Sequence, residues 1–90
     1  MANANTKLRR RLGPKLELRK FILAQQKRAR KVNGRKHCVR SCKAQSNSAV
    51  RGFDVALKYL AAGDYHSALQ YTRDGIADTT GAENLYGVED

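Results

Sequence analysis

The side chains best suited to chemistry in this sequence are cations, which stand in short runs at residues 9–11, 27–31 and 35–36. Arginine presents a planar fork of N–H donors that matches phosphate oxygens and can also address guanine edges. The runs therefore predict contact with a phosphate backbone. The predicted contact residues are Arg9, Arg10, Arg11, Arg19, Lys27, Arg28, Arg30, Lys31, Arg35, Lys36 and Arg40.

The cations are concentrated in one half of the chain. Residues 1–44 hold 15 of the 18 Lys and Arg residues and one acid, a net charge of +14. Residues 45–90 hold three bases and seven acids, a net charge of −4. Positive charges at this density repel one another until an anion neutralises them, and polyphosphates are the common anions of sufficient charge density. The sequence predicts a non-enzymatic nucleic-acid-binding protein.

The kind of nucleic acid is left open by the sequence. Arginine-rich helical segments suit RNA loops, which slightly favours RNA, and they can also lie along a DNA major groove. The alternative function is a protein-interaction module or inhibitor whose basic half docks on an acidic surface of a larger machine, such as a polymerase, nuclease or capsid. A basic helix with an apolar stripe is also compatible with an anionic membrane surface. The absence of Trp and the interruption of the stripe by Gln25 argue against that surface.

His37, Cys38 and Cys42 are the only candidates for a metal site, and they are weak ones. On a helix, residues 38 and 42 share a face, so two thiolates could chelate. Zinc sites usually need four ligands, and the chain has no second pair of cysteines. Further ligands could come from His66 or from a second copy of the chain, but the sequence specifies neither. The other interpretation is two small thiols that pack against neighbouring helices. No cofactor is predicted.

Catalysis has little support in the sequence. Adjacent His37 and Cys38 would point about 100° apart on a helix, which does not make a nucleophile and base pair. The acids are spread as caps and solvated faces, and no glycine-rich phosphate loop is present. The chain is therefore predicted not to be an enzyme.

The elements that position the cations are all predicted to be helical. Residues 1–12 are expected to form a flexible basic arm, followed by a basic helical region at 13–44. A helix about 27 Å long is predicted from Lys15 to Val32, opened by Gly13-Pro14 and ended by Asn33-Gly34. Its predicted inward stripe is Leu18, Phe21, Ile22, Gln25, Ala29 and Val32.

The acidic region, residues 45–90, is expected to form an antiparallel helical hairpin with a short C-terminal tail. A second basic helix is predicted at 35–44, and residues 45–48 read as a linker that supplies an N-cap. Helices follow at about 49–62 and 65–77, separated by Gly63-Asp64, with Ala68, Leu69, Thr72 and Ile76 facing inward on the second. Residues 78–81 are expected to form a turn, after which residues 82–86 add one helical turn. The fold class is therefore all-α.

Residues 49–82 resemble a single tetratricopeptide repeat, which is a pair of antiparallel helices. The resemblance rests on Ala56, Tyr59, the run 63–65 (Gly-Asp-Tyr), Ala68 and Gly75. It implies that small residues allow close helix packing while large residues fill the gaps. Gly52, Thr72 and Thr80 depart from the pattern. The residues expected to pack the hairpin are Phe53, Ala56, Leu57, Tyr59, Leu60, Gly63, Tyr65 and Ala68.

Partners and location follow from the same features. A lone hairpin leaves one apolar face for the stripe at 18–32 or for a second copy, so a homodimer is one expectation. No stretch approaches the roughly 20 apolar residues of a membrane span. With two cysteines and no export signal, the expected location is intracellular, cytoplasmic or nucleoid-associated.

Overall fold

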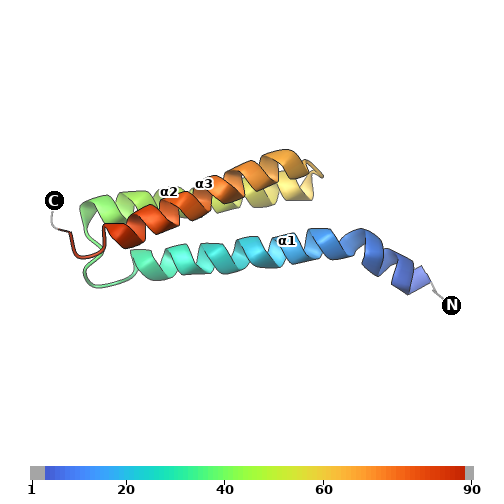
Figure 1. The fold of residues 1–90 in the computed structure, drawn as a ribbon, viewed down its shortest axis with the longest axis horizontal. Coiled ribbons are helices and arrows are strands. Elements are labelled where there is room, and N and C mark those ends of the chain that lie inside the picture. The colour runs from blue at the N-terminus through green and yellow to red at the C-terminus, as the bar shows by residue number, and fades with distance from the viewer. Residues whose placement is uncertain (1–3, 89–90) are drawn as a thin grey trace.

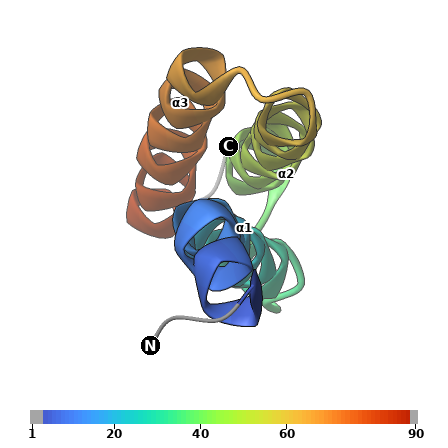
Figure 2. The ribbon, with the colours of Figure 1, turned by 90° about the vertical axis from the view of Figure 1, so that its right-hand side faces the viewer.

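The computed structural model describes the backbone of residues 4–88 and the side chains of residues 15–88. Within this range the chain forms three helices, α1 (Ala4–Asn33), α2 (Arg40–Ala61) and α3 (Tyr65–Asn84) (Figure 1). The all-α prediction is confirmed. Viewed along its length, the molecule places α1 against both other helices, so that the three form a triangle in cross-section (Figure 2).

Helices α2 and α3 run antiparallel and form the predicted hairpin (Figure 1). Phe53, Ala56, Leu60 and Ala68 are buried between the helices, as expected. Gly63 has φ +82°, a left-handed conformation that ends α2 without a Cβ clash. The predicted break at Gly63-Asp64 is confirmed.

Asp64 is the residue that caps α3. Its carboxylate accepts a hydrogen bond from the backbone N–H of Ser67 at 3.1 Å and another from the Ser67 hydroxyl at 2.8 Å. These bonds lower the pKa of the Asp64 carboxyl, chiefly through the backbone N–H, because they stabilise the ionised form. The cap therefore strengthens α3 wherever Asp64 is ionised and weakens as pH falls through its pKa.

Glycines let α2 and α3 approach closely. A Cβ built on Gly75 would lie 2.7 Å from the Phe53 ring, so any side chain there must displace a fully buried phenylalanine. Thr72 is buried nearby, and its hydroxyl donates to the Ala68 carbonyl at 2.6 Å. The small residues thus create the space that the large aromatic ring fills.

The tyrosines and Leu69 contribute less to this interface than the sequence suggests. Tyr65 is 49% exposed and Leu69 is 43% exposed, so neither belongs to the inward face of α3. Tyr59 is partly exposed and stacks on Tyr71, with ring centroids 5.5 Å apart. The packing prediction is therefore wrong for Tyr65 and Leu69, because large apolar groups need not be buried when small residues already close the helix pair.

The predicted linker at residues 45–48 does not exist, because α2 runs unbroken from Arg40 to Ala61. The polar side chains of residues 45–48 form hydrogen bonds with neighbouring helices or with the backbone of α2 itself. Gln45 and Ser48 both donate to the Asp78 carboxylate of α3, at 3.0 Å each. Ser46 is buried and donates to the Cys42 carbonyl at 2.8 Å. A polar cluster that reads as a loop is instead a set of buried and interhelical hydrogen bonds.

The C-terminal end of the hairpin also differs from the prediction. Helix α3 continues through the expected turn at 78–81 and ends at Asn84. Asp78 is held by α2, while Thr79 is buried with its hydroxyl bonded to the Gly75 carbonyl at 2.8 Å. Because the side chains of Asp78 and Thr79 find hydrogen-bond partners in the helical form, this turn-favouring segment stays helical.

Helix α1 packs on the hairpin through most of its predicted stripe. Ile22, Ala29 and Val32 are fully buried, whereas Phe21 is 46% exposed and does not face the core. Gln26, absent from the predicted stripe, is buried and donates to the Val50 carbonyl at 3.0 Å and to the Asp54 carboxylate at 2.8 Å. A buried amide therefore joins α1 to α2.

The N-terminal part of α1 differs from the expected arm. The backbone is helical from Ala4 and passes through Gly13 and Pro14, where the sequence predicts a helix start. The ribbon changes direction in this region and extends beyond the turn that joins α2 to α3 (Figure 1). Proline in a helix interior removes one backbone hydrogen bond and commonly kinks the axis. The molecule is consequently long and narrow, with extents of 60 × 21 × 14 Å.

Candidate nucleic-acid interface

Four of the predicted contact residues, Arg19, Lys27, Arg30 and Lys31, lie exposed along α1. Within the described part of the chain, their side chains make no ion pair or hydrogen bond. Lys27 and Lys31 are one turn apart, and Arg19 and Arg30 are three turns apart, so each pair shares a face. The buried stripe of α1 fixes these faces outward, because the opposite side of the helix is held against the hairpin.

Arg28 is a correction to the predicted set. Its guanidinium forms a two-pronged contact with the Glu83 carboxylate of α3, through Nη2 to Oε1 and through Nε to Oε2 at 3.4 Å. Nη1 also donates to Gln25 Oε1 at 3.3 Å. Arg28 therefore joins α1 to α3, and its charge is paired with that of Glu83 in this structure.

The connection between α1 and α2, together with the first residue of α2, presents three further predicted contacts. Arg35, Lys36 and Arg40 are all exposed. The Arg35 guanidinium carbon lies 5.4 Å from the Tyr86 ring centroid, a cation–π contact, and Tyr86 meets the His37 ring edge-on. The backbone N–H of Gly87 donates to the His37 carbonyl at 3.0 Å. The segment after α3 thus holds this basic connection in place.

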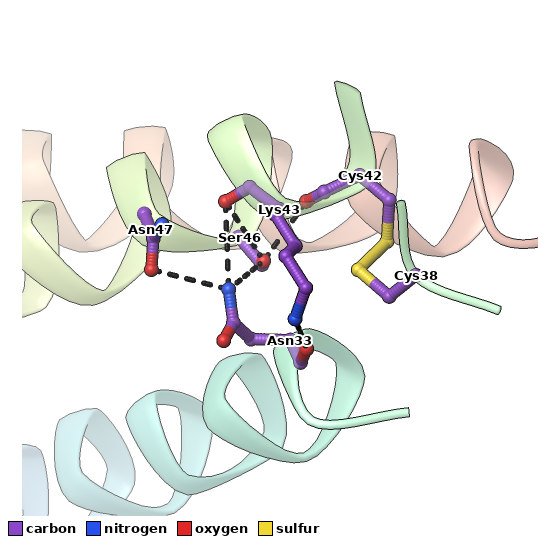
Figure 3. The surroundings of a disulfide bond; sticks show 6 residues. All are labelled: Asn33, Cys38, Cys42, Lys43, Ser46 and Asn47. Carbon is purple, nitrogen blue, oxygen red and sulfur yellow. Dashed lines mark hydrogen bonds between the residues drawn. A yellow bond between two sulfur atoms is a disulfide. The ribbon is translucent and has the colours of Figure 1, made fainter. Parts of the chain in front are cut away.

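A polar cluster supports the connection where α1 ends (Figure 3). The Asn33 amide donates to Ser46 at 2.8 Å and to Asn47 at 3.1 Å. Lys43 Nζ donates in turn to the Asn33 carbonyl at 2.8 Å, which places a cation at the C-terminal end of the α1 dipole. These bonds fix the direction in which the chain leaves α1.

Cys38 and Cys42 are joined in a disulfide, and both are buried. The bond is packed against Val32, Ala82 and Leu85 (Figure 3 shows its sulfurs beside the polar cluster). With the sulfurs bonded to each other, the two thiolates of the predicted weak metal site do not exist in this form. Among the described residues, no group of three or more potential ligands is suited to a metal ion. The pair acts here as a covalent link between the connection and the first turn of α2.

The predicted contacts Arg9, Arg10 and Arg11 belong to the helical backbone of α1, but their side chains lie outside the described set. Lys15 was not predicted. It is half-buried and lies with Arg19 beside the C-terminal end of α2. The spacing of four residues between these two cations was the available signal, since such residues share a helix face.

The acids of the hairpin are mostly engaged in internal contacts. Asp54 accepts from Gln26, Asp64 caps α3, Asp78 accepts from α2, and Glu83 binds Arg28. Only one salt bridge in the described region besides that of Arg28 is present, the exposed Lys20–Glu17 pair at 3.7 Å. The exposed cations of α1 therefore face solvent while many acids are committed within the fold.

Comparisons with known proteins give no family for the chain: no protein-family model matches it, and no curated protein or solved structure is similar. The tetratricopeptide resemblance stays a prediction. In the described residues, no helix combines the length and apolar character needed to cross a membrane.

Proposed function

We propose that the protein binds nucleic acid without catalysing a reaction, gripping the phosphate backbone with α1 and the connection that follows it. The observation that supports this proposal is the arrangement of Arg19, Lys27, Arg30 and Lys31. They are exposed and unpaired within the described region, on a helix whose opposite face is buried against the hairpin. Positioned cations of this kind gain from releasing the counterions of a polyphosphate. RNA is slightly favoured over DNA as the ligand.

The hairpin has a supporting role in this proposal. The hairpin packs against α1 at the buried residues Ile22, Gln26 and Ala29 and so fixes the orientation of that helix. Tyr65 and Leu69, both largely exposed on α3, offer an apolar surface for a protein partner or a second copy. Recruitment or dimerisation is therefore assigned to the hairpin, and phosphate contact to α1.

The test compares two triple charge reversals. One replaces Lys27, Arg30 and Lys31 by Glu, leaving Arg28 intact because it stabilises the fold. The matched control replaces Arg51, Lys58 and Arg73 by Glu, which changes the net charge equally on the hairpin. Binding to RNA and DNA hairpins is measured across a salt series. Each lost phosphate contact is expected to reduce the slope of log K against log [salt] by about 0.7–0.9.

The α1 variant is expected to lose most of its binding, and its slope of log K against log [salt] should fall by about 2–3. The control should keep both the affinity and the slope of the unmodified protein. Equal loss in the two variants would show that only total charge matters. Retained binding in the α1 variant would place the interface elsewhere. A partner that copurifies with the protein after nuclease treatment would favour the alternative function, docking on an acidic protein surface.

A further inference from the structure

A pocket of about 210 Å³ lies where α1 passes the C-terminal end of α2. The side chains described as lining it are Lys15 and Arg19 from α1 and Leu57, Leu60 and Ala61 from α2. Leu60 is buried at 1% exposure, Leu57 is half-buried, and Ala61 is exposed at the rim. The α1 segment that contributes the two cations runs alongside the yellow end of α2 (Figure 1).

The chemistry of the pocket combines an apolar floor with two positive charges. No carboxylate stands among its described lining residues. Its ligand must therefore bring an apolar surface and an anion close together. The volume is below the roughly 300–1,000 Å³ of pockets for drug-sized molecules, so it suits one small planar ring system or one side chain.

We propose that this pocket receives one unpaired base of a bound nucleic acid, whose adjoining phosphate pairs with Lys15 and Arg19. The inference rests on the proposed function, since Arg19 belongs to the same exposed row of cations. A nucleotide carries a flat base with apolar faces one sugar away from its phosphate, and those faces match a floor of leucines beside two cations. A planar guanidinium can also stack on a base.

The pocket would give the protein a preference that the cations alone lack. Phosphate contacts carry no information about sequence or pairing. Bases in a continuous duplex are stacked and cannot enter a side pocket, whereas bases in bulges and loops can be splayed out. The protein is therefore expected to select bulged or looped RNA over fully paired RNA.

The experiment uses two RNA hairpins that differ by one bulged nucleotide, which is a fluorescent adenine analogue. The unmodified protein is expected to bind the bulged hairpin about tenfold more tightly, because one face of the base leaves water against the leucines of the pocket. Fluorescence of the analogue is expected to rise as it leaves its stacked neighbours. Equal affinity for the two hairpins overturns the inference while leaving the proposed function standing; failure to bind either overturns both.

A matched pair of variants tests the pocket itself. Ala61→Leu fills the rim without changing charge, and Ala44→Leu makes the same change at an exposed alanine far along the same helix. Ala61→Leu is expected to abolish the preference for the bulge while paired RNA binds as before. Ala44→Leu is expected to leave both affinities unchanged. A bulge preference that survives Ala61→Leu would refute the assignment.

A peptide titration tests the alternative that the pocket binds a protein partner. A synthetic acidic peptide with a central Leu-Phe pair is titrated against the protein and against the Ala61→Leu variant. We expect only weak, salt-sensitive binding that is equal for both proteins. Tight binding that the variant loses, together with no bulge preference, would assign the pocket to a protein partner and overturn the proposal.

Discussion

At the scale of single residues, chemically alike cations have different roles. Lys27 and Arg28 are neighbours in the sequence, yet Lys27 is exposed and Arg28 is bonded to Glu83. The difference follows from the 100° between successive residues on a helix, which turns Arg28 towards α3. Charge counting treats the two as equal, so only the position of the acid separates a structural cation from a binding one.

Replacing Arg28 by Met and replacing Lys27 by Met are predicted to affect two different properties, stability and nucleic-acid binding. Arg28→Met should lower the free energy of unfolding by about 0.5–1 kcal/mol, because the Arg28–Glu83 pair is partly exposed and screened by water. It should leave the salt slope of RNA binding unchanged. Lys27→Met should do the opposite and reduce the slope by about 0.7–0.9. Urea unfolding and salt titrations measure the two effects, and a reduced slope in Arg28→Met would contradict the assignment.

At the scale of elements, hydrogen bonds between helices decide where each helix ends. Ser48 and Asp78 are turn-favouring types, and each stands inside a helix. They stay helical because Gln45 and Ser48 bind Asp78 across the α2–α3 interface. Local preference of this kind amounts to less than about 1 kcal/mol per residue, which tertiary contacts readily outweigh.

Two helical glycines at this interface are predicted to respond in opposite ways to alanine. A Cβ at Gly75 would meet the Phe53 ring at 2.7 Å, so Gly75→Ala should destabilise the protein by about 1–3 kcal/mol. A Cβ at Gly52 would meet only ordinary contacts, the nearest at 3.7 Å. Gly52→Ala should therefore stabilise the protein by up to about 1 kcal/mol through helix propensity. Urea unfolding followed by far-UV circular dichroism tests both, and tolerance of Gly75→Ala would show that Phe53 can move.

At the scale of the whole molecule, the chain is an elongated bundle in which one basic helix outreaches the hairpin that supports it. The α1–α2 connection is stapled by the Cys38–Cys42 disulfide and held by the Asn33 cluster. Both features lie at the end where all three helices meet (Figure 1). The opposite end of α1 extends beyond the hairpin, which leaves it accessible from several sides.

Loss of the disulfide is predicted to lower the free energy of unfolding and to leave the charge of the proposed interface unchanged. The double variant Cys38→Ala/Cys42→Ala should lower the free energy of unfolding by about 2 kcal/mol, the chain-entropy value for so short a loop. Unmodified protein in excess dithiothreitol should fall to the same stability, while the variant should not respond. If the reductant leaves the unmodified protein unchanged, the staple does not contribute to global stability.

The class of fold could be predicted from the sequence because helical periodicity is a local property. Phe53, Ala56 and Leu60 recur at the spacing of a buried face on α2, and Gly63-Asp64 marks a real break. The helix boundaries could not be predicted as well. Gln26, Ser46 and Thr79 are buried only because a neighbouring helix covers them, and their hydroxyl or amide groups are all satisfied there.

The sequence by itself determined the separation of charge, since covalent order alone puts 15 cations into the first 44 residues. It also determined the exposed row on α1, because the helical repeat turns cations away from the apolar stripe. Tertiary structure decided which cations stay free, which polar residues join helices, and that Lys15 and Arg19 flank an apolar pocket. These outcomes depend on distances between residues far apart in the chain, and no local spacing encodes such distances.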